Sequence, residues 1–385
     1  MIIYNIKVNT MDTEGVIENG YVHIEKNKIV SVGSMDGAEL SNFRMINGNG
    51  LEVYPGFIDI HTHLGIFEDG LTLEGDDGNE SSEPVTPHLR ALDAVNPNDR
   101  CFKDAVSAGI TTVITGPGSS NPIAGQSLAM KTHGNRIDKM VLKAPIAIKF
   151  ALGENPKTVY NEKNQMPYTR MATAALIREA LEKAKQYMIN KETSSDDEQP
   201  EYDMKSECLI PLLKREIQAH FHAHRADDIF TAIRIAKEFN LDYVIIHGTE
   251  GHLIVDELIE DNARVMSGPF LSDRSKPELL NLTPKTPAIL SNKGVVMAIV
   301  TDHPVIPIQY LPLCASLAVR EGMDKYEAMK AITIGAAKIC GLDNTIGSIK
   351  AGKDADLVFF EGDPLDIKNK PKMVICSGEL ILNIK

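Results

Sequence analysis

Residues 55–65 read Pro-Gly-Phe-Ile-Asp-Ile-His-Thr-His-Leu-Gly and predict a buried β-strand that ends in two histidines. Side chains on a strand alternate between its two faces, so His61 and His63 should point the same way at the carboxyl end of the strand. Two imidazoles side by side on a rigid element can supply half of the ligands of a divalent metal ion. A His-x-His pair also occurs by chance at strand ends, so its meaning depends on the rest of the chain.

Strands and amphipathic helices alternate through the middle of the chain, which is typical of parallel βαβ units. Eight parallel strands with intervening helices predict an α/β fold of the (β/α)8 TIM-barrel type, whose active site lies at the C-terminal face of the strands. The expected strands lie near residues 57–60, 107–114, 127–130, 146–152, 217–222, 243–247, 264–267 and 295–302.

Both ends of the chain show β-type alternation punctuated by Asn and Gly. Two β-rich termini that flank a long α/β segment predict that the ends pair with each other. We therefore expect a small β-sandwich domain built from residues 1–55 and 346–385, and a barrel formed by residues 56–345.

The 385-residue chain carries a formal net charge of −13, and nucleic acids and acidic membrane surfaces repel a net anion. No stretch has enough consecutive apolar residues to span a bilayer, and the first residues lack the pattern of a signal peptide. The five cysteines show no C-x-x-C spacing, which favours free thiols in a reducing compartment. These features predict a cytoplasmic protein with no nucleic-acid or membrane partner.

Two segments lack periodicity. Residues 68–97 are acidic and rich in Gly and Ser, and they directly follow the His-x-His strand. They are expected to form either a lid over the site or a solvated surface loop. Residues 193–200 predict a flexible loop between helices, with no chemistry of their own.

Titratable side chains recur where the expected barrel strands end. His222 and His247 each close a strand, and Asp302 follows an apolar strand in which a carboxylate has no packing role. Catalytic residues of barrel enzymes come from such positions on several strands. Together with His61 and His63, these residues are expected to converge on one site.

This set resembles the ligand set of the metal-dependent amidohydrolase superfamily, and is most similar to that of the imidazolonepropionase-related amidohydrolases, a grouping that also contains dipeptidases. The resemblance extends to the motifs at residues 55–59, 108–113 and 349–358, and spans nearly the whole chain in the right order. It implies one or two divalent metal ions per subunit and a homo-oligomer. Zinc is expected because the ligands are rich in imidazole, although iron or manganese also fits.

By this resemblance, His61 and His63 hold one metal ion, and His222 and His247 hold a second. Asp302 contacts the metal and the attacking water. It is the expected catalytic base, and later the acid that protonates the leaving group.

Lys149 matches the lysine that many such enzymes carboxylate to bridge two metal ions. An ammonium group has no lone pair for a metal, whereas a carbamate is an anionic oxygen ligand. The alternative for Lys149 is a salt-bridged lysine inside the barrel. Glu154 is the rival bridging ligand, although a role in bracing its loop fits its turn-rich surroundings better.

Candidate substrate-binding residues are less specific. A histidine near the metal could touch the substrate or orient a ligand, and an arginine matches a substrate carboxylate in a bidentate manner. The candidates are His224, His252, Arg170, Arg225 and Arg274.

The resemblance implies a metal-dependent hydrolase that cleaves a C–N amide bond of a small molecule with metal-activated water. A linear amide, such as a dipeptide or an N-acyl amino acid, is favoured because a bridging Lys149 implies two metals. The alternative is a cyclic amide of the imidazolonepropionase type. A further alternative is a non-catalytic barrel that serves as a scaffold.

Overall fold

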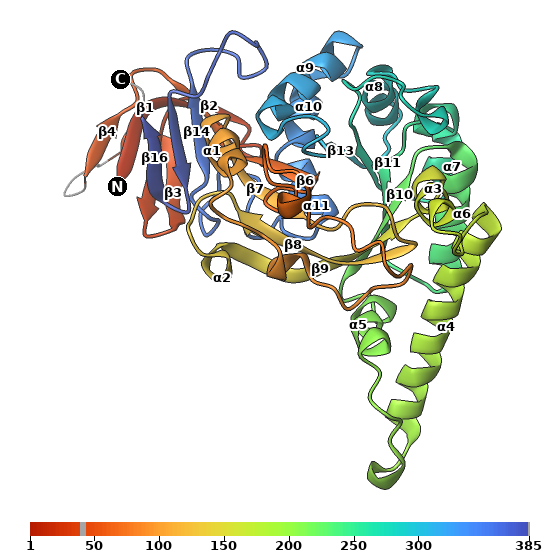
Figure 1. Cartoon of the computed structure of the whole chain (residues 1–385). Coiled ribbons are helices and arrows are strands. Elements are labelled where there is room, and N and C mark those ends of the chain that lie inside the picture. Colours follow the sequence, from red (N-terminus) through yellow and green to blue (C-terminus); the bar gives the residue numbers. More distant parts are fainter. Residues whose placement is uncertain (39–43, 384–385) are drawn as a thin grey trace.

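The computed structural model describes residues 1–38 and 44–383. Two eight-stranded sheets organise the described residues (Figure 1). The larger body is a barrel-like sheet in which the strands pair in chain order, from β6 to β13. Its strands are β6 (Phe57–Thr62), β7 (Ile110–Thr115), β8 (Ile123–Lys131), β9 (Val141–Ala151), β10 (Gln218–Ala223), β11 (Tyr243–His247), β12 (Val265–Ser267) and β13 (Met297–Ile299).

The sheet is nearly closed. Just beyond the end of β13, the backbone N–H of Asp302 donates to the carbonyl of His61 at 3.2 Å. The N–H of His63 donates to the carbonyl of His303 at 2.8 Å. The ends of the first and last strands therefore meet, and the expected α/β barrel-like architecture is confirmed.

The prediction that all eight strands are parallel was wrong for β8, which runs antiparallel to both β7 and β9. Only residues 116–122 link β7 to β8, and residues 132–140, with the single-turn helix α2 (Ile137–Met140), link β8 to β9. Parallel neighbours need a crossover of about a dozen residues or more, usually a helix. These links are too short for that, so the chain reverses direction twice.

The other strand-to-strand connections are mainly helical. They comprise α1 (Arg100–Ser107), α3 (Glu154–Glu162), α4 (Arg170–Thr193), α5 (Met204–Leu213), α6 (Ala226–Glu238), α7 (Val255–Glu260) and α8 (Lys285–Asn292). Helices α9 (Leu311–Arg320), α10 (Lys325–Ala331) and α11 (Ile334–Ile339) follow β13. None of the described helices is long and apolar enough to cross a membrane.

Helices α4 and α5 extend away from the barrel body (Figure 1). Around residues 193–200, where a loop was expected, α4 runs to Thr193 and a short 3-10 helix, η3, follows (Asp196–Glu198). In residues 68–97, two 3-10 helices form, η1 (Leu73–Gly75) and η2 (Ala91–Asp93). Isolated bridges join Val85 to Ile123 and Arg90 to Gln126, so part of this segment lies along β8.

The second sheet combines strands from both ends of the chain, as predicted. The strand order is β16-β15-β14-β5-β1-β2-β3, with β4 beside β1. The strands are β1 (Ile2–Asn9), β2 (Val16–Glu25), β3 (Lys28–Ser34), β4 (Met45–Asn47), β5 (Glu52–Pro55), β14 (Leu357–Phe360), β15 (Met373–Cys376) and β16 (Glu379–Asn383). All of them join one hydrogen-bonded sheet, so the two-sheet sandwich is not confirmed. The domain boundaries stay a prediction, and residues 39–43 and 384–385 lie outside the described residues.

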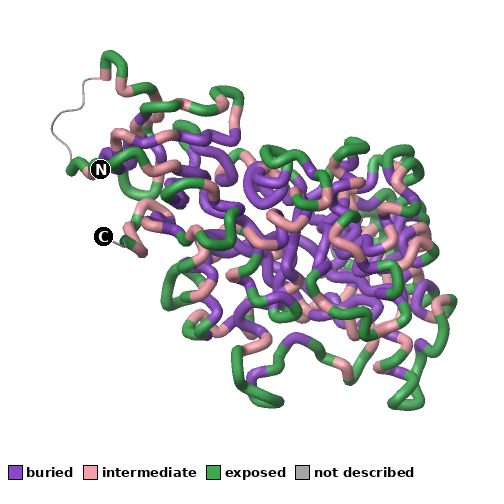
Figure 2. The backbone as a smooth tube through the Cα atoms, turned by 90° about the horizontal axis from the view of Figure 1, so that it is seen from above, coloured by how far each residue is buried: buried purple, intermediate pink, exposed green. Residues whose placement is uncertain are grey.

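The two sheets are in contact. The ring of Phe57 on β6 stacks on that of Phe360 on β14, with 6.0 Å between centroids. Lys131 at the end of β8 pairs with the buried carboxylates of Asp354 and Asp356. Figure 2 shows the buried backbone concentrated inside the barrel body, with exposed residues mostly on its surface loops.

The barrel strands are buried on both faces, as expected for a sheet covered by helices. Charged or polar residues within such strands therefore need specific partners.

Candidate metal centre

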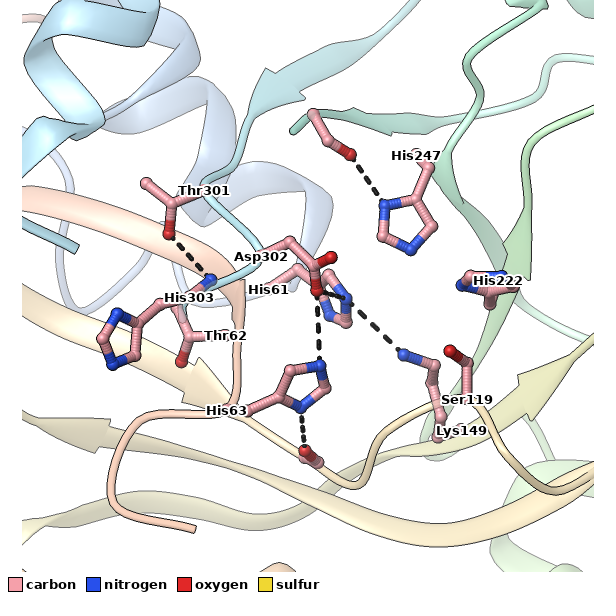
Figure 3. Close-up of polar contacts among 12 residues, drawn as sticks. His61, Thr62, His63, Ser119, Lys149, His222, His247, Thr301, Asp302 and His303 are labelled. Atoms are coloured by element: carbon pink, nitrogen blue, oxygen red, sulfur yellow. Dashed lines mark hydrogen bonds and ion pairs between the residues drawn. The ribbon is translucent and has the colours of Figure 1, made fainter. Parts of the chain in front are cut away.

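Histidines from three barrel strands and one aspartate gather at the carboxyl ends of the strands (Figure 3). The Nε2 atoms of His61 and His63 lie 3.1 Å and 3.3 Å from Oδ1 of Asp302. The ring centroids of His61 and His247 lie 5.3 Å apart, and the ring centroids of His222 and His247 lie 4.6 Å apart. The structure thus brings together side chains that lie up to 241 positions apart in the sequence (61 to 302).

Backbone carbonyls fix the orientation of two of these rings. Nδ1 of His63 lies 2.7 Å from the carbonyl oxygen of Gly116, and Nδ1 of His247 lies 2.7 Å from that of Gly268. A carbonyl oxygen only accepts, so each Nδ1 carries the proton and each Nε2 presents a lone pair unless the ring is charged. This is the arrangement by which proteins orient histidine ligands toward a metal.

The contact between His63 and Asp302 tests whether a cation fits. In a neutral His63 ring, Nε2 is an acceptor that faces a carboxylate oxygen 3.3 Å away. Two acceptors repel unless a proton or a metal ion lies between them. A divalent ion bound to Nε2 of His63, Nε2 of His61 and Oδ1 of Asp302 satisfies all three atoms without charging a buried imidazole.

Two groups of side chains have the geometry to hold a metal ion. His61, His247 and Asp302 form one, and His222, His224 and His247 form the other. In each group the ligand atoms lie within 4.8 Å of one another. The predicted ligands His61, His222, His247 and Asp302 therefore converge, and His224, expected to touch the substrate or to orient a ligand, lies among them.

The backbone is strained where the ligands leave their strands. His247 has a φ of +73° and Asp302 a φ of +55°, a region that residues other than glycine rarely occupy. Such conformations persist only where the surrounding structure holds them, and they cluster at functional sites. Here they turn the side chains of His247 and Asp302 inward at the strand ends.

Burial controls the charge of the site. Desolvation lowers the pKa values of His61, His222 and His247, which keeps these imidazoles neutral, the form that binds metals. Burial alone would raise the pKa of Asp302, but its attraction to the His247, His61 and His63 rings in their protonated form holds that pKa well below its usual range. With neutral imidazoles, a metal ion bound among them would supply the positive charge that keeps the carboxylate ionised. The site therefore combines neutral imidazoles with one ionised carboxylate.

Lys149 on β9 projects into the same space, with Nζ 3.5 Å from Nε2 of His61. It is only 2% exposed, and burial lowers its pKa to about 8. Among the described residues, no carboxylate forms an ion pair with it. Asp302 nevertheless attracts the ammonium form and opposes part of the lowering of its pKa. Both the carbamate and the salt-bridged interpretation of Lys149 therefore stay predictions.

Glu278 is a further residue of the site that was not predicted from the sequence. This residue lies in the 3-10 helix η5 (Pro277–Leu279), is 1% exposed, and has Oε1 3.9 Å from Nε2 of His222 and 3.7 Å from Nε2 of His224. Burial alone would raise the pKa of Glu278, but His222, His224 and Lys276 lower it. The connection that contains η5 has no hydrophobic periodicity in the sequence. The position of Glu278 after a barrel strand is therefore the only feature of the sequence that could have indicated it.

Two neighbours of Glu278 were also missed. Lys276 donates from Nζ to Oε1 of Glu278 at 2.9 Å and to Oδ1 of Asn155 at 2.7 Å. The amide of Asn155 donates in turn to Oγ of Ser119 at 2.7 Å. Segments that follow three different barrel strands, β7, β9 and β12, are thereby joined beside the histidines.

The rival bridging ligand, Glu154, starts helix α3. Its backbone N–H donates to Oε2 of Glu278 at 3.1 Å, so its main chain supports the site. No metal-ligand group among the described residues includes its carboxylate.

The remaining candidates are engaged by other groups. Arg170 forms a bidentate pair with Asp228, and Arg225 forms one with Asp227. Arg274 is exposed and donates to the carbonyl of Leu282 at 2.6 Å. His252 is hydrogen-bonded by way of Nδ1 to Thr286 at 2.9 Å. The structure does not bring these four side chains into contact with the histidine cluster.

A barrel-like sheet whose strand ends gather neutral histidines and an ionised aspartate is the architecture of a metal-dependent hydrolase. The chain belongs to the amidohydrolase family, whose model matches residues 53–381. This confirms the resemblance found in the sequence and assigns the chain to a family of enzymes that hydrolyse carbon–nitrogen bonds.

Three comparisons place the chain within this family. A crystal structure of an amidohydrolase from Thermotoga maritima MSB8 is 41% identical, superimposes with a TM-score of 0.95, and covers 99% of each chain. The amidohydrolase tasK of Hapsidospora irregularis is 27% identical over 93% of this chain, which spans 39% of that longer protein. An imidazolonepropionase of Fusobacterium nucleatum subsp. nucleatum is 24% identical over 94% of this chain and 92% of its own length.

Proposed function

We propose that the protein is a metal-dependent hydrolase that cleaves a C–N amide bond of a small molecule. The observation that carries this proposal is the distance of 3.3 Å between Oδ1 of Asp302 and Nε2 of His63. Nδ1 of the same histidine ring is already hydrogen-bonded to the carbonyl oxygen of Gly116. Zinc is the proposed ion because imidazoles dominate the site, and iron or manganese is the alternative.

Each residue of the site has a role in this reaction. His61, His63 and Asp302 would hold a divalent ion, which would supply a Lewis acid for the substrate carbonyl and would lower the pKa of water toward ~7. Asp302 takes the proton from the attacking water, whose oxygen forms the new bond to the carbonyl carbon. Asp302 then gives that proton to the leaving nitrogen, so the products are a carboxylic acid and an amine.

The favoured substrate is a linear amide, such as a dipeptide or an N-acyl amino acid. This preference rests on Lys149, whose neutral amine is proposed to form an N–C bond to CO₂ and release one proton to solvent; the resulting carbamate would be an anionic oxygen ligand for two ions. The reaction requires a neutral amine, and the buried Lys149 has a pKa of about 8 and no ion-pair partner among the described residues. About a tenth of such an amine is neutral at pH 7 and about half at pH 8.

The second candidate is a cyclic amide of the imidazolonepropionase type. Full-length similarity to the imidazolonepropionase of Fusobacterium nucleatum favours it. The two candidates differ in what they require of Lys149. Hydrolysis of a linear amide with two metal ions would use its carbamate as a ligand, whereas the cyclic-amide candidate gives the carbamate no role.

A substrate screen tests the proposal. Protein loaded with one or two equivalents of zinc is incubated with dipeptides, N-acyl amino acids and cyclic amides, and released amine is measured. Turnover of linear amides supports the favoured reading, and turnover of imidazolones alone selects the alternative. A fully metal-loaded protein that hydrolyses none of them would contradict the hydrolase proposal and favour a scaffold.

A further inference from the structure

A cavity of about 600 Å³ lies between the sheet built from both termini and the helices that follow β13. Its walls come from the turn after β1, from α10 and α11, and from the segment that leads into β14. Cavities of about 300–1,000 Å³ are the usual size of small-molecule sites. This cavity is therefore large enough for a ligand of that class.

The charge of the cavity has the opposite sign to that of the whole chain. Four lysines and two aspartates line it, although the chain has a net charge of −13. One aspartate, Asp12, is already engaged by its neighbours. Its Oδ2 accepts from Oγ of Ser348 at 2.8 Å, and its Oδ1 accepts from Nζ of Lys350 at 3.2 Å. The cavity therefore keeps a surplus of positive charge, which comes from Lys330, Lys338, Lys350 and Lys353.

Lys353 is a buried cation without an ion-pair partner among the described residues. It is only 7% exposed, and its Nζ donates to the carbonyl oxygen of Ile346 at 3.2 Å. An ammonium group has three N–H donors, so two remain for another acceptor. Lysines buried to this extent are almost always paired, because an unpaired charge is costly to remove from water. Lys353 therefore lacks a counter-ion.

Two other lysines act on the same ammonium group. Burial lowers the pKa of Lys353, and the charges of Lys350 and Lys338 lower it further, while Asp12 and Asp343 oppose the change. Among the described residues, Lys338 has no carboxylate at ion-pair distance. Neighbouring like charges repel each other unless an anion lies among them. An anion with more than one negative charge would balance this group of lysines.

We propose that this cavity binds a phosphate group, either as inorganic phosphate or on a small phosphate ester. Lysine ammonium groups bind phosphate oxygens as point charges. On the same wall, the half-exposed ring of Tyr326 and the side chain of Ile334 offer apolar surface to the organic part of an ester. The concave shape favours a small molecule over a nucleic acid, which the net charge of the chain repels.

The proposed site is separate from the candidate metal centre. Ile332, between α10 and α11, accepts at its carbonyl oxygen from the N–H of Ile58 at 2.8 Å. Ile58 is at the start of β6, whereas His61 and His63 lie at the other end of that strand. The helices of the cavity therefore contact the opposite end of the barrel. The inference does not depend on the proposed hydrolase function.

Calorimetric titration of the full-length, zinc-loaded protein, freed of unbound zinc, tests the proposal. The probes are inorganic phosphate and adenosine monophosphate. Wild-type protein should bind at least one of them, and Lys338→Gln should lower that affinity about tenfold, as expected for the loss of one hydrogen bond to a charged group. The matched control is Lys293→Gln, which should keep the wild-type affinity because Lys293 is also exposed at the end of a helix, α8, but outside this cavity.

The two probes distinguish the sources of the phosphate group. Tighter binding of adenosine monophosphate than of phosphate, weakened by Tyr326→Ala, would identify a phosphate ester as the occupant. Equal affinities would identify free phosphate, and both results support the site. Adenosine, which carries no phosphate, should not bind.

Two results of the titration would overturn the proposal. One is no binding of either probe at about 10 mM, which is ten times a weak dissociation constant of about 1 mM. The other is equal affinity in wild type and Lys338→Gln, which is the result expected if the probe binds at the metal centre. Crystals soaked in tungstate, an analogue of phosphate, provide a second measurement. An anomalous peak between Lys338 and Lys353 is expected, and its absence from this cavity would contradict the inference.

Discussion

At the scale of single residues, Asp302 is the only carboxylate in contact with both His61 and His63 among the described residues. A positive charge beside it, on the surrounding imidazoles or on a bound metal ion, is what keeps it ionised despite its burial. The same residue can therefore bind a cation and accept a proton from water, and this dual role makes it the most sensitive position of the site.

Asp302→Asn should lower turnover by about 10²–10⁴-fold, because an amide cannot act as a base and general acid–base catalysis typically contributes that much. The fold should survive, since an amide fills nearly the same volume. Steady-state kinetics on whichever amide the screen identifies, together with a thermal unfolding curve, checks both parts. Retention of full activity would remove Asp302 from the mechanism.

Lys149 provides a second prediction at this scale. Protein loaded with zinc in ¹³C-bicarbonate at pH 8 should show a carbamate carbon signal by NMR, and Lys149→Met should lack it. The signal should weaken as the pH falls below about 8, because less of the amine is neutral and able to react. A wild-type spectrum without the signal would end the preference for a linear amide and leave the cyclic one.

At the scale of elements, the sequence predicted the strands better than their directions. Runs such as residues 243–246 are apolar throughout, so burial in a barrel could be recognised from them. A hydrophobic pattern has no direction, however, and β8 was assumed to be parallel like its neighbours. The lengths of the links at 116–122 and 132–140 contained the missing information, because neither can return the chain for a parallel strand.

The candidate site was predictable only where its residues end regular strands. His61, His63, His222 and His247 follow that rule. Glu278 does not, because it lies eleven residues beyond the end of β12 (267 to 278), in a loop whose path depends on tertiary contacts with Gly153 and Asn155. No local pattern could have placed it.

The end of β12 gives a prediction about an element. Gly268 has a φ of +144°, a Cβ there would lie 2.0 Å from the carbonyl oxygen of Val300, and its own carbonyl orients His247. Gly268→Ala should therefore destabilise the fold by about 2 kcal/mol or more and weaken metal binding. Chemical denaturation and metal titration measure the two effects.

Gly294→Ala is the matched control, since this glycine also has a positive φ but nothing within 4 Å of an added Cβ. It should cost less stability and leave metal binding unchanged. Equal effects of the two substitutions would show that the contact at Gly268 has no special importance.

At the scale of the whole molecule, a buried charge cluster joins the barrel to the sheet built from both termini. Lys131 is 5% exposed and lies 3.0 Å from Oδ2 of Asp354, with Asp356 also in contact. Lys28 pairs with the other oxygen of Asp354 at 2.7 Å, but its side chain is 44% exposed. One carboxylate thus has a buried and an exposed cation as partners.

Lys131→Met should reduce the free energy of unfolding by about 3–5 kcal/mol, because it removes the buried cation that Asp354 and Asp356 share and leaves Asp354 with only the more exposed Lys28. Lys28→Met removes a largely solvated partner of the same carboxylate and should cost about 0–1 kcal/mol. Urea unfolding of both variants provides the comparison. Similar costs for the two would mean that the buried cluster does not couple the two sheets.

The central claim is that residues distant in the sequence converge to bind a divalent cation at the carboxyl ends of the barrel strands. Anomalous diffraction at the zinc edge, from crystals grown with zinc, measures this directly. We predict a peak within bonding distance of Nε2 of His61, Nε2 of His63 and Oδ1 of Asp302. Crystals that contain zinc elsewhere but show no peak among these three atoms would contradict the account.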